Sequence, residues 1–165
     1  MWQKQNSNAN SSYELLVNFE INNPGGVRYR RPYVSLWVED KKGFPVRTIS
    51  LWAQTTPPGP RWIPDLRRWF RSDRVRQFTD KTDLVATVSG PTRQPGKYSL
   101  LWDGTDDQQK PVKPGDYTLY LEAVREHGSY QILKRVITVA DRPFKAEMGG
   151  NEEIKSATLE YRRRR

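Results

Sequence analysis

The chain has 165 residues, no cysteine and a formal net charge of +9. A chain of this length can bury a core without metal or disulfide staples, and the lack of cysteine excludes disulfides, thiolate metal sites and a cysteine nucleophile. No apolar run approaches the roughly 20 residues that are needed to span a bilayer.

The composition changes along the chain predict one domain with two short flanks. Residues 1–12 form a polar leader that lacks the hydrophobic centre of a signal peptide, and we expect it to be disordered. Residues 13–161 carry the apolar patterns and are expected to form a single β-sandwich domain. Residues 162–165 are all arginine and form a basic tail.

Alternating apolar and polar residues predict strands from the start of this domain. Residues 13–21 alternate over nine positions, so every second side chain lies on one face of a strand. Residues 32–53 alternate on both sides of Lys41-Lys42-Gly43, which predicts a β-hairpin. Residues 130–139 and 154–161 predict two further strands.

The most marked β-pattern lies at residues 96–128, where two alternating apolar runs flank a turn region rich in glycine, proline and aspartate. Asp103-Gly104 permits a sharp turn, while Pro111 and Pro114 exclude a helix. We therefore expect the two runs to pair as a β-hairpin.

The period changes after a proline-rich connector at residues 54–60. Apolar residues then recur at the spacing of one helical face, and the arginines fall on the opposite side. These apolar residues are Trp62, Leu66, Trp69 and Phe70. The pattern predicts a short amphipathic helix over residues 64–72, lying on the sheet, with Pro64 in its first turn.

Residues 72–94 show no clear period and predict a long loop with a short extended piece at residues 84–88. Taken together, six or seven short strands, one short helix and turns dense in glycine and proline indicate a mainly β protein. The fold class expected is an immunoglobulin-like antiparallel β-sandwich with one short amphipathic helix.

The arginines of the predicted helix are the main candidate binding surface. Guanidinium groups beside an aromatic ring can contact anionic lipid head groups, a flavin phosphate or an acidic protein. The residues of this surface are Trp62, Arg67, Arg68 and Arg71. The plainer interpretation is a solvated helix face. No nucleic-acid-binding signature accompanies the charge, so nucleic acid is not the expected partner.

His127 is the single histidine, and it lies between Glu126 and Gly128 at a predicted turn. An imidazole can ligate a metal or haem iron, but no further ligands surround this one in the sequence. We expect an exposed or structural histidine and no metal site. Asp103, Asp106 and Asp107 could suggest calcium, but aspartate at turns also caps the backbone, which is the interpretation favoured here.

Several motifs spread along the chain resemble one family. They are Leu36-Trp37-Val38-Glu39-Asp40, Arg47-Thr48, Arg61-Trp62 through Leu66 to Trp69, Ser89-Gly90-Pro91-Thr92-Arg93, residues 96–121 and Glu122-Ala123-Val124-Arg125-Glu126-His127-Gly128. With these motifs the chain, over roughly residues 12–161, resembles the Domain of Unknown Function 2271 family of predicted periplasmic proteins. The segment from Trp102 to Tyr117 also resembles the immunoglobulin-like module of flagellar hook-capping proteins.

The resemblance implies an exported protein, so the sequence is expected to be the mature portion of a periplasmic one. Members of this family are often encoded near membrane proteins with PepSY domains and near enzymes that attach flavin mononucleotide (FMN) to exported proteins. The implied role is a non-enzymatic accessory or partner-binding domain in a membrane-associated, flavin-linked redox or iron-handling system. A membrane or periplasmic protein is the expected partner, and no cofactor is expected.

Two alternatives remain open. In the first, the protein carries covalent FMN at Thr92, because residues 86–92 are similar to the attachment motif of flavin transferases. The motif departs twice, with Ala86 in place of aspartate and Pro91 in place of alanine. In the second, the domain binds carbohydrate or the cell envelope through exposed coplanar aromatics among Trp37, Trp52 and Trp62.

Overall fold

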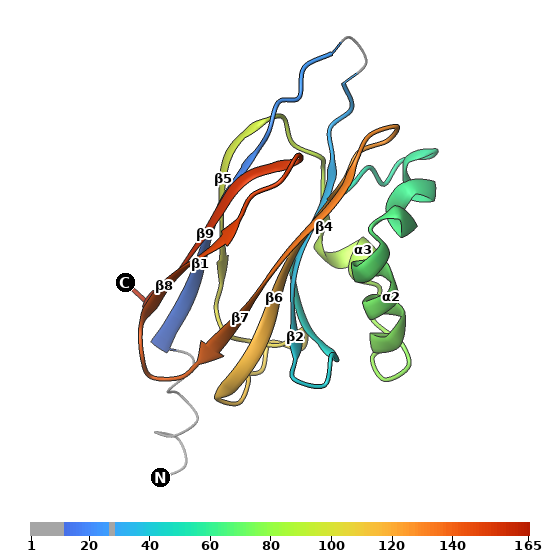
Figure 1. Ribbon diagram of the computed structural model, residues 1–165. Coiled ribbons are helices and arrows are strands. Elements are labelled where there is room, and N and C mark those ends of the chain that lie inside the picture. The colour runs from blue at the N-terminus through green and yellow to red at the C-terminus, as the bar shows by residue number, and fades with distance from the viewer. Residues whose placement is uncertain (1–11, 27–28) are drawn as a thin grey trace.

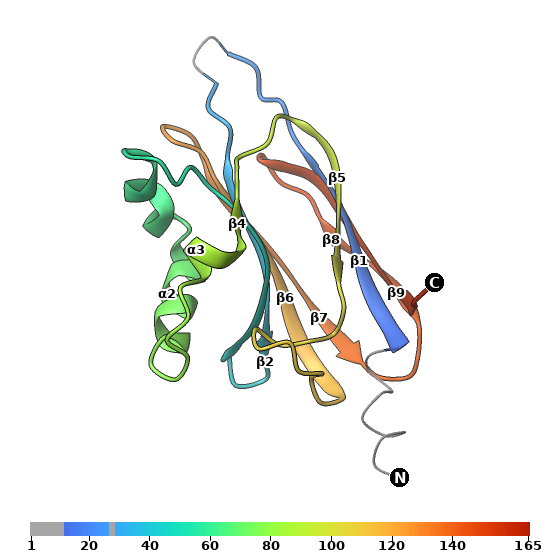
Figure 2. The ribbon, with the colours of Figure 1, turned by 180° about the vertical axis from the view of Figure 1, so that it is seen from behind.

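The computed structural model describes residues 12–26 and 29–165. The chain forms two β-sheets packed face to face, with helices covering the outer face of one sheet (Figures 1 and 2). The mainly β sandwich predicted from the sequence is thus confirmed. The expectation for the leader concerns residues 1–12, which lie outside the described residues except for Ser12.

The first sheet contains four strands in the order β5-β1-β9-β8, and every neighbouring pair is antiparallel. Its strands are β1 (Tyr13–Ile21), β5 (Gly96–Trp102), β8 (Phe144–Gly149) and β9 (Ile154–Arg163). The predicted alternation of β1 is confirmed, because its odd-numbered residues are buried and its even-numbered residues are half-buried.

The second sheet contains five strands in the order β4-β3-β2-β6-β7. Its strands are β2 (Tyr33–Asp40), β3 (Pro45–Trp52), β4 (Ser89–Gly90), β6 (Gly115–Val124) and β7 (Tyr130–Val139). The pairs are antiparallel except for the short parallel pairing of β3 with β4. The hairpin predicted for residues 32–53 is present as β2 and β3.

The hairpin predicted at residues 96–128 is wrong. Its two runs do form strands, but β5 pairs with β1 in the first sheet while β6 pairs with β2 and β7 in the second. The connection over residues 103–114 is long enough to cross between the sheets, whereas hairpin loops are short. The strands still face each other through the core, where Trp102 and Tyr117 meet edge to face at 6.4 Å between ring centroids.

The helical region is longer than predicted. A 3₁₀ helix, η2 (Gly59–Asp65), leads into α2 (Arg67–Arg76), which continues four residues beyond the expected end at Ser72. The piece expected to be extended at residues 84–88 is a second α-helix, α3 (Leu84–Val88). Its first turn is capped by Asp83, whose side chain accepts a hydrogen bond from the Ala86 amide at 3.3 Å. The chain therefore has more than the single helix expected.

Two further differences lie near the C-terminus. Strand β8 was not predicted, although Phe144, Ala146 and Met148 alternate with charged residues. Strand β9 continues to Arg163, so the first arginines of the basic tail belong to the first sheet. Arg162 pairs with Glu14 of β1 in the sheet, and their side chains form an ion pair at 2.9 Å.

Candidate functional site

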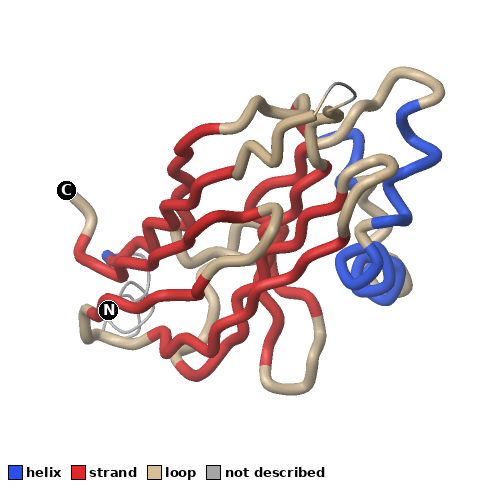
Figure 3. Tube along the Cα trace, turned by 45° about the horizontal axis from the view of Figure 1, so that its top comes forward, coloured by secondary structure: helices blue, strands red, loops and turns tan. Residues whose placement is uncertain are grey.

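Helix α2 lies on the outer face of the second sheet (Figure 3). Leu66 and Trp69 are buried from this side against residues of β2, β3 and β6. They belong to a second apolar cluster that also includes Tyr33, Trp37, Leu51, Ala53, Ile63 and Tyr120. The helical spacing of apolar residues therefore sets which side of α2 faces the sheet.

A buried glutamate of β6 caps the start of α2. The N-cap residue, Leu66, provides no side-chain hydrogen bond to the helix. Instead Glu122 accepts the backbone amides of Arg68 at 2.8 Å and Trp69 at 2.9 Å, and it also accepts the hydroxyl of Tyr130. A carboxylate is favourable there because the first amides of a helix lack partners and carry partial positive charge. Burial and the bond to Glu122 raise the pKa of the Tyr130 phenol.

A second buried glutamate, Glu39 of β2, holds one of the helix arginines. Arg68 donates to Glu39 at 2.9 Å, and its guanidinium lies 4.4 Å from the centroid of the Tyr120 ring. Glu39 also accepts Trp37 Nε1 at 2.8 Å and the Ser72 hydroxyl at 3.2 Å. The hydrogen bond to Glu39 raises the pKa of Arg68, which therefore stays charged in this half-buried position.

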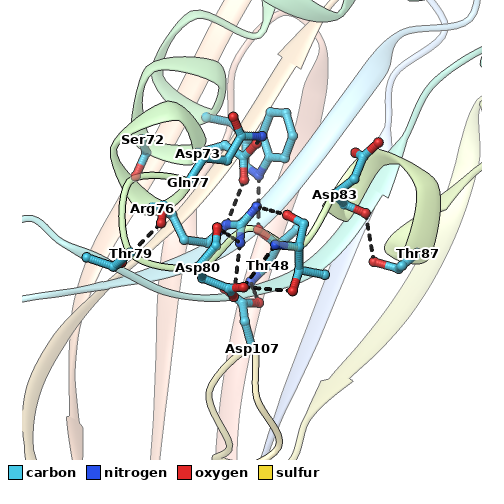
Figure 4. Close-up of polar contacts among 12 residues, drawn as sticks. Thr48, Ser72, Asp73, Arg76, Gln77, Thr79, Asp80, Asp83, Thr87 and Asp107 are labelled. Carbon is cyan, nitrogen blue, oxygen red and sulfur yellow. Dashed lines mark hydrogen bonds and ion pairs between the residues drawn. The ribbon is translucent and has the colours of Figure 1, made fainter.

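Arg76, near the end of α2, is buried and serves as the centre of an ion-pair cluster (Figure 4). Its guanidinium contacts Asp73 at 2.8 Å and Asp80 at 3.1 Å, and it donates to the Thr82 carbonyl at 2.7 Å. Burial raises the pKa of Asp73, and the adjacent Arg76 opposes this shift. The cluster joins the end of α2 to the turn that follows it.

The opposite side of α2 points to solvent. Its exposed residues recur at helical spacing and continue just past the end of the helix. They are Arg67, Arg71, Arg74, Val75 and Phe78, which we call the outer α2 face. The side chain of Phe78 is 82% exposed and that of Val75 is 44% exposed. Among the described residues, no carboxylate forms an ion pair with the three arginines of this face.

The four predicted residues of the binding surface do not all lie together. Arg67 and Arg71 are on the outer α2 face, and the Arg67 guanidinium lies 4.5 Å from the Tyr130 ring centroid. Arg68 points inward to Glu39 and is not free to bind a partner. Trp62 is half-buried in η2 and packs against the cluster beneath the helix.

Sequence reasoning missed Arg74, Val75 and Phe78. The signal that could have found them was available, because the spacing from Arg67 through Arg71 to Arg74 and Phe78 continues one helical side. Only the end that we predicted for the helix, at Ser72, excluded them.

Thr92, the candidate flavin attachment residue, follows β4 and is 7% exposed. It lines an open groove of about 490 Å³ together with Arg31, Gln54 and Ser89 among others. The neighbouring Arg93 covers the Trp52 ring, with its guanidinium 4.8 Å from the ring centroid. The groove is polar, and Thr92 lies in its wall.

The remaining candidate residues from the sequence are His127, Trp37 and Trp52. The His127 side chain is 87% exposed and lies 3.5 Å from Glu126, and no group of three or more metal-ligating side chains occurs in the part of the chain that the structure describes. Trp37 and Trp52 are buried, so they do not form the platform of exposed aromatics on which the carbohydrate- or envelope-binding alternative depends.

Asp103 and Asp106 cap turns of the 103–114 connection, as predicted, whereas Asp107 bonds to strand β3. Asp103 accepts the amide of Thr105 at 3.1 Å, Asp106 accepts that of Gln108 at 2.9 Å, and Asp107 accepts that of Thr48 at 2.9 Å. These bonds use the carboxylates within the fold.

Fold and site together define a class of protein: a two-sheet β-sandwich whose second sheet is covered by helices, one of them basic on its outer side. A family model described as a predicted periplasmic protein (DUF2271) matches residues 14–156. The chain belongs to this family and is accordingly a periplasmic protein. No curated protein and no solved structure matches it. Among the helices of the described residues, none is long and apolar enough to cross a membrane.

Proposed function

We propose that this protein is a non-enzymatic, periplasmic partner-binding domain whose outer α2 face docks onto an acidic surface in the cell envelope. The observation that carries this proposal is the division of the helix into two sides. On the inner side, Arg68 and Arg76 form ion pairs with carboxylates. On the outer side, Arg67, Arg71 and Arg74 have no carboxylate partner among the described residues. A fixed helix that presents unpaired arginines suits recognition of carboxylates or phosphates.

Two features of the outer α2 face support docking over a merely solvated surface. Phe78 and Val75 place exposed apolar area at the end of the row of arginines, and such an apolar anchor beside a charged rim is typical of interfaces. The helix is also held by Glu122 and Glu39 from the sheet, so little ordering is needed on binding.

The non-enzymatic part of the proposal is supported by the use of the buried carboxylates. Glu39 and Glu122 each accept hydrogen bonds from both α2 and the second sheet, and Glu153 pairs with Arg125 at 2.9 Å. Contacts of this kind give these buried carboxylates a role in holding the fold together. The further setting, a flavin-linked redox or iron-handling system with a PepSY-type membrane partner, rests on the family resemblance alone, and identification of the partner tests it.

The experiment compares three forms of the protein in capture from the native envelope. The first is the wild type, the second is R67E/R71E/R74E, and the third is the charge-matched control K110E/K113E/K155E, whose lysines are exposed elsewhere. We expect one partner with wild type and control, and its loss with the second form. Equal capture by all three forms would refute the proposal.

The same three proteins, mixed with phosphatidylglycerol vesicles, separate a protein partner from an anionic lipid surface. Sedimentation of wild type and control with the vesicles, but not of the second form, would identify the lipid as the acidic surface. If wild type and control capture a protein partner but do not sediment with the vesicles, the acidic surface is that of a protein.

A second candidate function is covalent flavin carriage at Thr92, which is favoured by the position of this residue in the wall of an open groove. Mass spectrometry of protein purified from its native host tests it. Added FMN that disappears in Thr92→Ala would establish this function, and an unmodified mass would exclude it.

A further inference from the structure

β7 is an edge strand of the second sheet and β8 is an edge strand of the first, and the two lie side by side along one edge of the sandwich (Figure 1). Among the described residues, β7 pairs only with β6 and β8 pairs only with β9. Each strand therefore has one edge that carries unpaired backbone groups. A groove of about 610 Å³ runs between them, within the range of volumes that bind ligands.

Only one of the two strands presents a regular edge. β7 pairs with β6 over ten consecutive residues, from Tyr130 to Val139, without a shift in register. The pairing of β8 with β9 shifts between Glu147 and Gly149. Irregular strands resist the addition of a partner strand, and long regular edges invite it. The edge of β7 is thus the one suited to receive an added strand.

The lining of the groove indicates what would bind there. Val136 of β7 is 63% exposed, and Phe144 and Ala146 of β8 contribute partly buried apolar surface. The charged side chains that line the groove are three cations and one carboxylate. They are Arg135, Arg142, Lys145 and Asp141. The excess of positive charge favours an occupant that carries acidic residues.

Arg135 spans the groove. It lies on β7, is exposed, and donates to the Glu147 carbonyl of β8 at 3.2 Å. A carboxylate is a stronger acceptor for a guanidinium than a backbone carbonyl is. An acidic side chain that enters the groove can therefore replace the Glu147 carbonyl as the acceptor of the Arg135 hydrogen bond.

We propose that β7 binds an extended, acidic segment of a partner protein as an added strand that fills the groove between β7 and β8. Backbone hydrogen bonds to β7 hold the segment. On the face of the segment toward β8, acidic side chains pair with Arg135, and on its opposite face apolar side chains contact Val136. This site shares no residue with the outer α2 face and does not rest on the function proposed for that face.

The probe is a fluorescein-labelled peptide of ten residues in which glutamate alternates with valine, titrated by fluorescence anisotropy. We expect binding that weakens at least tenfold in Arg135→Glu and in Val136→Glu. Both side chains are exposed, so both variants are expected to fold. Lys97→Glu, at the opposite edge on β5, is the matched control and should bind as the wild type does.

Two changes to the peptide test separately whether it binds as an added strand and whether its acidic side chains are needed. Methylation of alternate backbone nitrogens on one edge should abolish binding, and replacement of glutamate by lysine should do the same. In the wild-type complex, amide exchange should slow along the edge of β7. Binding that survives methylation, that is equal for the lysine peptide, or that is unchanged in Arg135→Glu would overturn the proposal.

Discussion

The arginines of α2 divide into two groups that share one helix and one residue type but have different roles. Arg68 and Arg76 point toward the sheet, where each contacts a carboxylate that is almost completely buried. Arg67, Arg71 and Arg74 point outward without such partners. The difference lies in what surrounds each side chain, because the sheet supplies Glu39 and the helix supplies Asp73 on one side only.

This comparison separates what holds the helix in place from what the helix presents. Removal of a contact on the inner side leaves a buried charge or amide without a partner, which is expensive in free energy. Removal of an exposed arginine leaves nothing unpaired. The inner side should therefore govern stability, and the outer side should govern binding.

The largest effect is expected from Glu122→Ala, because this carboxylate serves two helix amides and two hydroxyls. We expect the free energy of unfolding, measured with urea, to fall by about 4 kcal/mol. Glu147→Ala, an exposed glutamate of β8, should change it by less than about 0.5 kcal/mol. Equal effects would show that Glu122 does not anchor the helix.

Arg76→Ala tests the inner group at the far end of α2. It leaves Asp73 buried without its cation, and we expect a loss of about 3 kcal/mol in the free energy of unfolding. Arg74→Ala, on the outer side two residues away, should cost less than about 0.5 kcal/mol. A loss that is similar in the two variants would break the distinction between the two groups.

Arg68→Ala is expected to have an intermediate effect. Its partner Glu39 is buried, but the Arg68 side chain is itself partly open to water, so water can replace part of the lost contact. We expect a loss of about 1–2 kcal/mol by urea unfolding, against almost none for Arg71→Ala. If Arg71→Ala destabilised the protein as much, the outer side could not be called free.

The smallest expected effect concerns pH. Burial raises the pKa of Asp73 above its ordinary value of 3.8, so the folded state holds this proton more tightly than the unfolded state. The stability that Asp73 contributes is fully present below pH 3.8 and declines as the pH rises through the raised value. The free energy of unfolding of the wild type relative to Asp73→Asn should accordingly fall as the pH rises above about 4. An increase over this range would mean that the pKa of Asp73 is lowered instead.

Local sequence pattern predicted the strands other than β4 and β8, because alternation depends only on neighbouring residues. It did not predict which strands pair. The runs of β5 and β6 flank a turn-rich segment, but the pairing of Leu15 with Trp102 and of Leu36 with Leu121 sends them into different sheets. That outcome depends on strands far away in the chain.

The candidate site shows the same limit. Helical spacing placed Arg67 and Arg71 on the polar side correctly, but it also placed Arg68 there. The inward turn of Arg68 depends on Glu39, which lies in a strand 29 residues earlier in the chain. No local sequence pattern predicts the contact between Arg68 and Glu39.

The central claim is that the outer α2 face is the surface at which this protein meets its partner. The most direct test places photoreactive benzoylphenylalanine at Phe78, and in a matched control at Leu101, which is exposed on β5 of the other sheet. After irradiation of the native envelope, the claim predicts a specific crosslinked product from position 78, lost in the R67E/R71E/R74E background, and none from position 101. Crosslinking that is equal at both positions, or that persists in that background, would contradict it.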